Sequence, residues 1–202
     1  IAMSDGLQFA RRIRTSPYFE RVRQHGVTGY SVYNHMILPK SFGMSVEDSY
    51  SHLNENVQIW DVSVQRQVEI TGPDAARLVQ WLTPRDLRQA ETGRCYYIPV
   101  VDRDGGMLND PVLLKLAADR FWLSVADSDL LLYVKGLAIG GGYDVSVEEP
   151  DVNPLAIQGP KAVSVIAALF GEAVAKLKFF HFTHIDLFGT RQIVSRSGFS
   201  SA

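Results

Sequence analysis

Three runs of strand-forming residues, separated by short turns, constrain the fold of this chain more than any other feature. Residues 95–102, 107–116 and 120–125 are rich in apolar and aromatic side chains. Turn sequences stand between them at 104–106 (DGG) and 118–119 (AD), and such short loops are typical of β-hairpins. The segment is therefore predicted to form an antiparallel meander.

Helical and strand-like patterns flank this meander. Asp74 is a suitable N-cap for a helix over residues 75–82, and a second helix is expected over residues 128–137. Residues 58–71 contain a stretch in which apolar and polar side chains alternate, as in a half-buried strand. Further expected elements are a strand at 155–158 and a helix at 161–170. The mixture predicts an α+β fold with antiparallel sheets and packed helices.

The composition limits the class of protein and its partners. The chain has 202 residues, of which 46% are hydrophobic and 21% charged, a balance typical of a globular protein with a core. Its formal net charge of -2 offers nothing to attract a polyanion, so we expect no nucleic-acid partner. The single cysteine, Cys95, cannot form an internal disulfide, and no apolar run approaches the roughly 18 residues of a membrane span. We therefore expect a cytoplasmic protein with no membrane partner.

Five phrases occur in an order that points to one protein family. They are residues 59–63 (IWDVS), 68–75 (VEITGPDA), 105–110 (GGMLND), 155–162 (LAIQGPKA) and 195–199 (SRSGF). In this order the chain resembles the glycine-cleavage T-protein superfamily. The resemblance implies a folate-binding domain around a tetrahydrofolate pocket, normally completed by a carboxy-terminal barrel that is missing here. Residues 1–202 are then an incomplete folate-binding region, with 59–147 an α/β subdomain inserted within it.

The amino-terminal third resembles one branch of that superfamily, the dimethylsulfoniopropionate demethylases. The phrases concerned are residues 26–30 (GVTGY), 32–39 (VYNHMILP) and 93–99 (GRCYYIP). A T-protein has a Gly-Trp-x-Met-Pro phrase where residues 34–39 stand, and an Asn-Ala-Ala-Asn run near residues 126–129; this chain has neither. Phe199 stands where the demethylase has Trp, so a close relative that uses a different methyl donor is an alternative.

Asp110 is the candidate catalytic residue. It lies between Leu108 and the apolar run 112–114, where an unpaired carboxylate would be costly to bury. From the residues alone, an aspartate that caps a turn is as good an interpretation as a functional carboxylate. The resemblance identifies it with the pocket aspartate, which implies a hydrogen bond to the N5 or N10 region of folate and an electrostatic preference for a cationic donor.

Other candidate site residues surround this aspartate in the expected pocket. Tyr96 and Tyr97 alternate in direction on a strand, so only one of them can face a given pocket. Taken alone, each is better explained as a simple strand former. The candidates for folate binding are Tyr96, Tyr97, Asp110, Arg196 and Phe199, of which Arg196 and Phe199 come from the resemblance. The candidates for substrate binding are Tyr30, Tyr33, His35 and Phe179, because aromatic faces bind both a flat pterin and an onium cation.

Several residues also have structural interpretations. His35 can contact substrate or relay a proton, but a histidine with a purely structural role is the alternative. Trp60 and Trp122 are expected in the core. His181 and His184 are three residues apart without a third ligand, so we expect no metal site.

These features predict a tetrahydrofolate-dependent methyltransferase. In-line attack by N5 of tetrahydrofolate on a sulfonium methyl group needs mainly alignment and a dry pocket, because the leaving thioether is neutral. Aminomethyl transfer, as in the glycine cleavage system, and a non-catalytic folate-binding module remain alternatives. Because the barrel is missing, we expect the 202-residue chain to be an incomplete catalyst with an open cleft near Asp110 and Phe199. Sheet edges and apolar surface exposed by the missing part are also compatible with a homo-oligomer.

Overall fold

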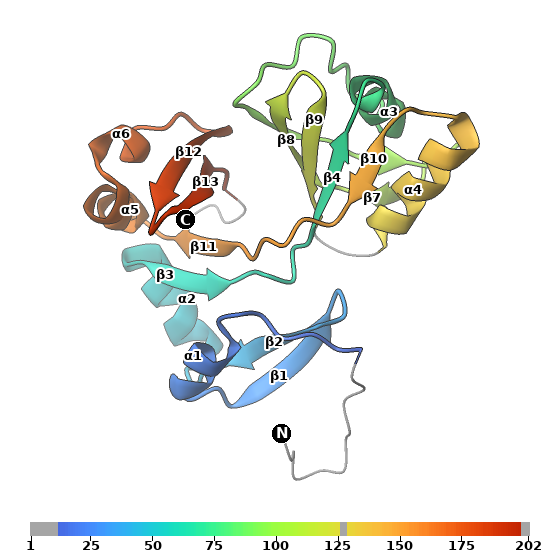
Figure 1. The fold of residues 1–202 in the computed structure, drawn as a ribbon. Helices are drawn as coiled ribbons and strands as arrows, with labels where there is room; N and C mark the ends of the chain where they lie inside the picture. Colours follow the sequence, from blue (N-terminus) through green and yellow to red (C-terminus); the bar gives the residue numbers. More distant parts are fainter. Residues whose placement is uncertain (1–11, 126–128, 199–202) are drawn as a thin grey trace.

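The computed structural model describes residues 12–125 and 129–198, which form three lobes around a central ribbon of two strands (Figure 1). The helices are α1 (Phe19–Gln24), α2 (Val46–Glu55), α3 (Ala75–Leu82), α4 (Leu130–Gly141), α5 (Ala162–Phe170) and α6 (Glu172–Ala175). The strands are β1 (Gly29–Tyr33), β2 (Met36–Ser41), β3 (Gln58–Asp61), β4 (Gln67–Thr71), β5 (Cys95–Tyr97), β6 (Val100–Val101), β7 (Met107–Asn109), β8 (Val112–Ala117), β9 (Arg120–Ser124), β10 (Ser146–Glu148), β11 (Leu155–Gln158), β12 (His181–Leu187) and β13 (Thr190–Arg196). The fold is α+β, as the sequence predicts.

A five-stranded sheet in the order β10-β4-β9-β8-β5 forms the main body of the molecule. All of its neighbouring strands are antiparallel, and α3 and α4 pack against it. The buried residues of α3 are spaced to form one helical stripe, Ala75, Leu78, Val79 and Leu82. They share one core with Ile70 and Leu113 of the sheet and Val134 of α4. The antiparallel sheet and the helix at 75–82 are thus confirmed, and the second helix begins at Leu130.

Two prolines divide the strands that the sequence predicts as continuous. β5 ends at Tyr97 and β8 begins at Val112, and the short pair β6–β7 lies between them. Pro99 and Pro111 have no N–H group, so neither can continue a ladder of hydrogen bonds. Ile98 N–H donates to the Pro111 carbonyl at 3.1 Å where the two breaks meet. The predicted strands 95–102 and 107–116 were therefore too long.

Asp74 precedes α3, but its side chain does not cap this helix. Its backbone has φ -96° and ψ 5°, which is close to helical, whereas a capping side chain needs an extended residue to reach the first turn. Oδ2 of Asp74 instead accepts the backbone N–H of Asp144 at 3.0 Å and an Arg77 donor at 3.1 Å. The prediction of a cap is wrong, and Asp74 ties the start of α3 to the segment between α4 and β10.

The hairpin β12–β13 contacts the sheet face opposite α3. Cys95 and Leu114 are neighbours across β5 and β8, and both contact Phe182 of β12. The Cys95 N–H donates to the Phe180 carbonyl at 2.8 Å, which fixes the hairpin to the start of β5. Side chains alternate along a strand, so Tyr96 points to the α3 core while Cys95 points to the hairpin.

The β1–β2 hairpin and the segment before it form the amino-terminal lobe. Asn34 and His35 at its turn both have positive φ, 46° and 62°, as the two central residues of a type I′ turn require. Arg14 extends the pairing of β2, because its N–H donates to the His35 carbonyl and its carbonyl accepts the Ile37 N–H, each at 2.8 Å. The residues on either side of this turn are therefore held in place.

The ribbon β3–β11 runs between the lobes (Figure 1). Trp60 on β3 has 41% of its surface exposed, and its indole N–H donates to Gln58 at 2.9 Å. The expectation of a core position for Trp60 is wrong, because a ribbon of two strands leaves a face uncovered. Gly159 follows β11 with φ 112°, and a Cβ there would meet the carbonyl of Asn56, the residue after α2, so only glycine fits.

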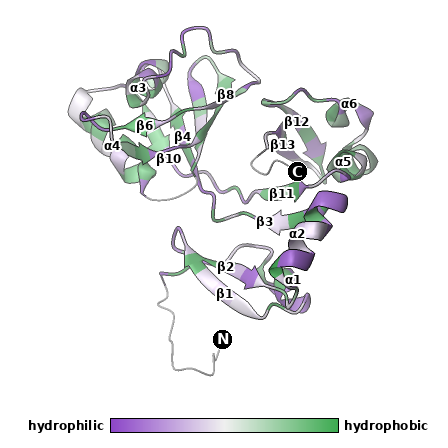
Figure 2. Cartoon of the chain, turned by 180° about the vertical axis from the view of Figure 1, so that it is seen from behind, coloured by the Kyte–Doolittle hydropathy of each residue, from purple (hydrophilic) through white to green (hydrophobic). Residues whose placement is uncertain are grey.

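Hydrophobic residues also run along α5 (Figure 2), although none of its described residues is buried. Within residues 12–125 and 129–198, no helix combines the length and apolar character needed to cross a bilayer.

Candidate functional site

One end of the five-stranded sheet collects side chains from several strands. Tyr97 pairs with Val112, Val112 with Ser124, and Ser124 with Gln67, so these residues form one row across the sheet. Arg66 precedes Gln67 and continues the ladder, since its carbonyl accepts the N–H of residue 125 at 2.8 Å. Adjacent strands lie about 4.8 Å apart, so the three steps between Gln67 and Tyr97 span about 14 Å. We call this row, with Arg66 and Asp110, the Tyr97 end of the sheet.

Asp110 lies at this end, in the break between β7 and β8. The Tyr97 hydroxyl donates to Asp110 Oδ2 at 3.2 Å. Tyr97 has 42% of its surface exposed and Asp110 is exposed as well, so the expected burial cost of this carboxylate does not arise. Desolvation, followed by the Asp110 carboxylate, raises the pKa of Tyr97 above its ordinary value. At neutral pH the phenol therefore remains a hydrogen-bond donor to the carboxylate.

Tyr96 has a different role from its neighbour. Only 9% of its surface is exposed, and its hydroxyl accepts the Glu91 backbone N–H at 2.7 Å. The guanidinium groups of Arg85 and Arg94 lie over its ring, 5.4 Å and 5.7 Å from the centroid. The alternation predicted from the sequence is confirmed, and it leaves Tyr97, not Tyr96, beside Asp110.

The turn residues Asn34 and His35 contact the segments before β4 and after β9. Nε2 of His35 is 3.5 Å from Oδ1 of Asp129, which follows β9, and both side chains are exposed. The neighbouring Asn34 donates to the Val64 carbonyl at 2.9 Å, just before β4. Positive φ at non-glycine residues is often found at functional sites. The turn of the β1–β2 hairpin is thus placed near the Tyr97 end.

The remaining candidates lie on other parts of the fold. Tyr30 packs on Phe19 of α1 with ring centroids 5.6 Å apart, and Tyr33 ends β1. Phe179, 60% exposed, packs on Phe180 at 4.6 Å.

The Arg196 side chain donates to the Leu177 carbonyl at 3.0 Å. In the β12–β13 hairpin, Arg196 pairs with His181. His181 also forms an isolated β-bridge with Arg94, which lies at the opposite end of β5 from Tyr97. Phe199 lies outside the described residues. Of the predicted folate-binding residues, the structure thus brings Tyr97 and Asp110 together.

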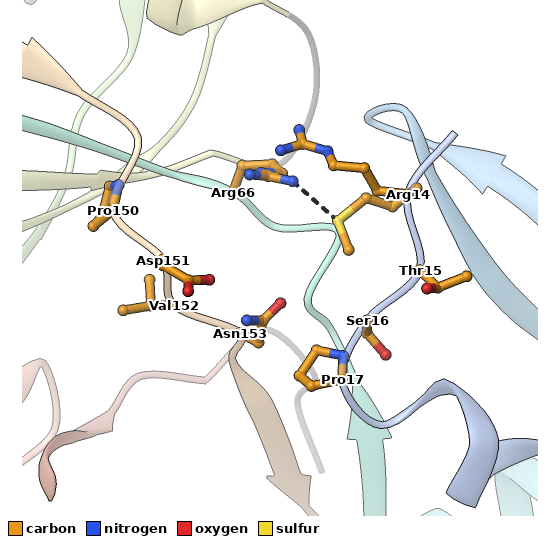
Figure 3. Close-up of a pocket in the computed structure, with 10 residues that line it drawn as sticks. Arg14, Thr15, Ser16, Pro17, Arg66, Pro150, Asp151, Val152 and Asn153 are labelled. Atoms are coloured by element: carbon orange, nitrogen blue, oxygen red, sulfur yellow. Dashed lines mark hydrogen bonds between the residues drawn. The ribbon is translucent and has the colours of Figure 1, made fainter. Parts of the chain in front are cut away.

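A cleft of about 400 Å³, which the sequence did not predict, adjoins Arg66, three strands away from Tyr97 in the same sheet. Arg14 and Arg66 line it on one side, and the segment 150–153 lines the other (Figure 3). Both arginines form ion pairs with Oε1 of Glu149, that of Arg14 at 2.8 Å. One signal was present in the sequence: Arg66 occupies an inward position in the alternating run that also contains Val68.

Metal-binding groups do not gather in the part of the chain that the structure describes, where no three His, Cys, Asp or Glu side chains come together. Cys95 is buried, and burial raises the pKa of its thiol to about 12. The thiol therefore stays protonated near neutral pH, which makes it a poor nucleophile or metal ligand.

Comparisons with known proteins identify relatives along nearly the whole chain. Residues 18–202 match the family "GCVT N-terminal domain". The chain is 51% identical over 191 residues to the dimethylsulfoniopropionate demethylase DmdA of Ruegeria pomeroyi, which covers 95% of this chain and 52% of that protein. It is 29% identical over 192 residues to an aminomethyltransferase of Lysinibacillus sphaericus, covering 93% of this chain and 52% of the relative.

A solved structure shares the fold. The crystal structure of the glycine cleavage system aminomethyltransferase T from Bartonella henselae superposes with a TM-score of 0.78, covering 93% of this chain and 51% of that one, at 23% sequence identity. The chain spans about half the length of the curated relatives it matches.

Proposed function

The chain belongs to the GCVT N-terminal domain family, and from this premise we propose that it acts in tetrahydrofolate-dependent methyl transfer. The proposed reaction demethylates dimethylsulfoniopropionate, or a similar sulfonium or quaternary ammonium donor, and yields 5-methyltetrahydrofolate. The observation that carries the proposal is the similarity to the Ruegeria demethylase, which exceeds the similarity to the Lysinibacillus aminomethyltransferase over the same length of chain.

The Tyr97 end of the sheet fits a folate co-substrate. A pteridine ring is flat and carries N–H donors, so it suits an aromatic face beside a carboxylate. Tyr97 offers an exposed ring, and Asp110 an exposed carboxylate whose position the tyrosine hydroxyl fixes. Both residues are proposed folate ligands. Arg196 and Phe179 lie at the β12–β13 hairpin, and no contact of either with Tyr97 or Asp110 supports a role in binding.

Tetrahydrofolate, when bound, supplies the N5 amine that accepts the methyl group. The methyl carbon leaves sulfur with the bonding electron pair remaining on the sulfur atom, so a cationic donor becomes a neutral thioether and the amine loses a proton. The task of the protein is therefore alignment and exclusion of water, because the leaving group needs no protonation. Asp110 contributes a negative charge that favours a cationic donor near the folate, most strongly where water is excluded.

Aminomethyl transfer is the second candidate, supported by the similarity to the Lysinibacillus aminomethyltransferase. That reaction takes its one-carbon unit from a lipoyl carrier protein, so it needs a docking surface as well as a folate site. A folate-binding module without catalysis is the third alternative.

A donor panel tests these alternatives. The protein is incubated with tetrahydrofolate and either dimethylsulfoniopropionate, glycine betaine or an aminomethylated lipoyl carrier protein, and the folate products are identified by mass spectrometry. We expect 5-methyltetrahydrofolate with the sulfonium donor. Methylenetetrahydrofolate formed with the carrier protein would establish aminomethyl transfer instead, and folate binding without any product would establish a binding module.

A further inference from the structure

The cleft that Arg14 and Arg66 line has walls that are held in place by several contacts. Arg14 is fixed by the backbone hydrogen bonds of its bridge to β2. The opposite wall is tied to the same segment, since the Tyr18 hydroxyl donates to the Asn153 carbonyl at 2.9 Å. Ser16 of this segment donates to a carboxylate oxygen of Asp61 at the end of β3. The cleft is therefore a built feature of the fold, formed by four separate segments of the chain.

The two arginines in this cleft are only partly neutralised by their protein partner. The guanidinium groups of Arg14 and Arg66 lie next to each other (Figure 3) and share one oxygen of Glu149. Burial, and then the charge of Arg14, lower the pKa of Arg66 to about 10, which still leaves it protonated at neutral pH. Each guanidinium has five N–H donors, so one shared carboxylate oxygen leaves donors available for a ligand.

One of those donors meets a poor acceptor. Nη1 of Arg66 donates to the thioether sulfur of Met36 at 3.3 Å (Figure 3). A thioether accepts hydrogen bonds weakly, whereas a guanidinium and a carboxylate form short, charge-assisted, often bidentate bonds. The Arg66 side chain is 19% exposed, so water screens such a bond less than it would at the surface. A ligand carboxylate would therefore gain by taking the place of the sulfur.

Asp151 limits which carboxylates fit. Its side chain comes from the wall that faces Arg66 (Figure 3), and its charge acts on the Arg66 guanidinium. Arg14, Arg66, Glu149 and Asp151 together carry no net charge, so a second carboxylate on the ligand would meet repulsion. A cationic group on the ligand would instead be attracted to Asp151.

Resting on the proposed function, we propose that this cleft binds a zwitterionic methyl donor. Arg14 and Arg66 hold the donor's carboxylate, and Asp151 faces its onium group. Three strand spacings, about 14 Å, separate Gln67 from Tyr97, so a donor held in the cleft and a folate held at Tyr97 and Asp110 would bind at neighbouring positions along this row. The arginines thereby select donors that have a carboxylate over donors that have only the cation.

The glutamate tail of folate is the other source of a carboxylate near the site. It carries two carboxylates, which makes it a poorer match beside Asp151 and Glu149. The experiment therefore includes tetrahydropteroate, which has the folate ring system without the glutamate.

Calorimetric titration of the protein tests this assignment with dimethylsulfoniopropionate and with ethyldimethylsulfonium, which lacks the carboxylate. We expect Arg66→Met and Arg14→Gln each to weaken binding of dimethylsulfoniopropionate by roughly tenfold to a hundredfold, the range for a lost hydrogen bond to a charged group. Binding of ethyldimethylsulfonium should stay unchanged. Arg103→Gln is the matched control, because Arg103 is an exposed arginine paired with its neighbour Asp104, and it should alter neither affinity.

Asp151→Asn keeps the test decisive if an arginine variant fails to fold. We expect this variant to bind dimethylsulfoniopropionate more weakly and glutarate, a dicarboxylate, more tightly than the wild type. The proposal is overturned if the wild type does not prefer the zwitterion, or if the arginine variants weaken both sulfonium compounds equally. It is also overturned if they weaken tetrahydrofolate but not tetrahydropteroate, since the cleft would then hold the folate tail.

Failure of this inference is distinguishable from failure of the proposed function. If the protein forms 5-methyltetrahydrofolate while the arginine variants retain their preference for the carboxylate, the cleft assignment alone is wrong. If no donor yields 5-methyltetrahydrofolate, the proposed function is wrong, whatever the cleft binds.

Discussion

The core of the five-stranded sheet and its Tyr97 end are built from the same strands, yet different forces fix their residues. Leu113 of β8 is fully buried, whereas Asp110, three residues earlier, is exposed. Tyr96 and Tyr97 are neighbours in sequence, and one packs into the core while the other contacts Asp110. Burial holds Leu113 and Tyr96 in place, whereas a hydrogen bond at the surface holds Tyr97 and Asp110. Changes in the core should therefore cost stability, and changes at the Tyr97 end should cost binding.

The largest effect is expected in the core. Leu113→Ala removes a fully buried side chain that packs among residues of α3 and α4, so the free energy of unfolding should fall by about 2–5 kcal/mol. Urea unfolding followed by circular dichroism measures this loss. A loss no larger than that of Leu132→Ala, at an exposed position of α4, would mean that the core does not carry the stability assigned to it.

Asp110→Asn should have the opposite profile. Because Asp110 is exposed, the free energy of unfolding should hardly change. The affinity for tetrahydrofolate should fall by roughly tenfold or more, since a neutral amide gives up a charge-assisted hydrogen bond. Fluorescence titration measures the affinity, with Asp104→Asn, in the exposed turn between β6 and β7, as the matched control. Equal affinities for Asp110→Asn and the wild type would remove Asp110 from the site.

Tyr97→Phe should give the smallest effect, because the ring remains and only the hydroxyl contact with Asp110 is lost. We expect a loss of tetrahydrofolate affinity of about twofold to tenfold. The raised pKa of Tyr97 means that its hydrogen bond is fully present below the ordinary tyrosine pKa of 10.0 and is lost as pH rises through the higher folded value. The difference between wild type and variant should therefore be constant from neutral pH to pH 10.0 and shrink above it. A difference that vanishes near neutral pH would contradict this account.

The sequence pattern predicted the strands and helices well where residues close together in the chain determine the secondary structure. The apolar spacing of α3 and the strand alternation that separates Tyr96 from Tyr97 are both local properties of the chain. The breaks at Pro99 and Pro111 were also readable, since proline lacks the donor that a strand needs, but the apolar runs on either side outweighed them.

The cleft could not be predicted in the same way. Arg14, Arg66 and Glu149 are far apart in sequence and meet only where the amino-terminal segment lies near Arg66 and the segment 150–153. The exposure of Trp60 was missed for a related reason, because the pairing of β3 with β11 rather than with the main sheet is a tertiary choice. The subdomain boundaries 59–147 and the roles of Tyr30, Tyr33 and Phe179 stay predictions.

Hydrogen exchange with and without tetrahydrofolate tests the central claim most directly, since it locates the folate without assuming any residue. The claim is that folate binds at the Tyr97 end of the sheet. We predict slower exchange on binding in peptides that cover residues 96–111 and 64–68, with no change in peptides from α5. Protection confined to the β12–β13 hairpin, with none at residues 96–111, would contradict the claim.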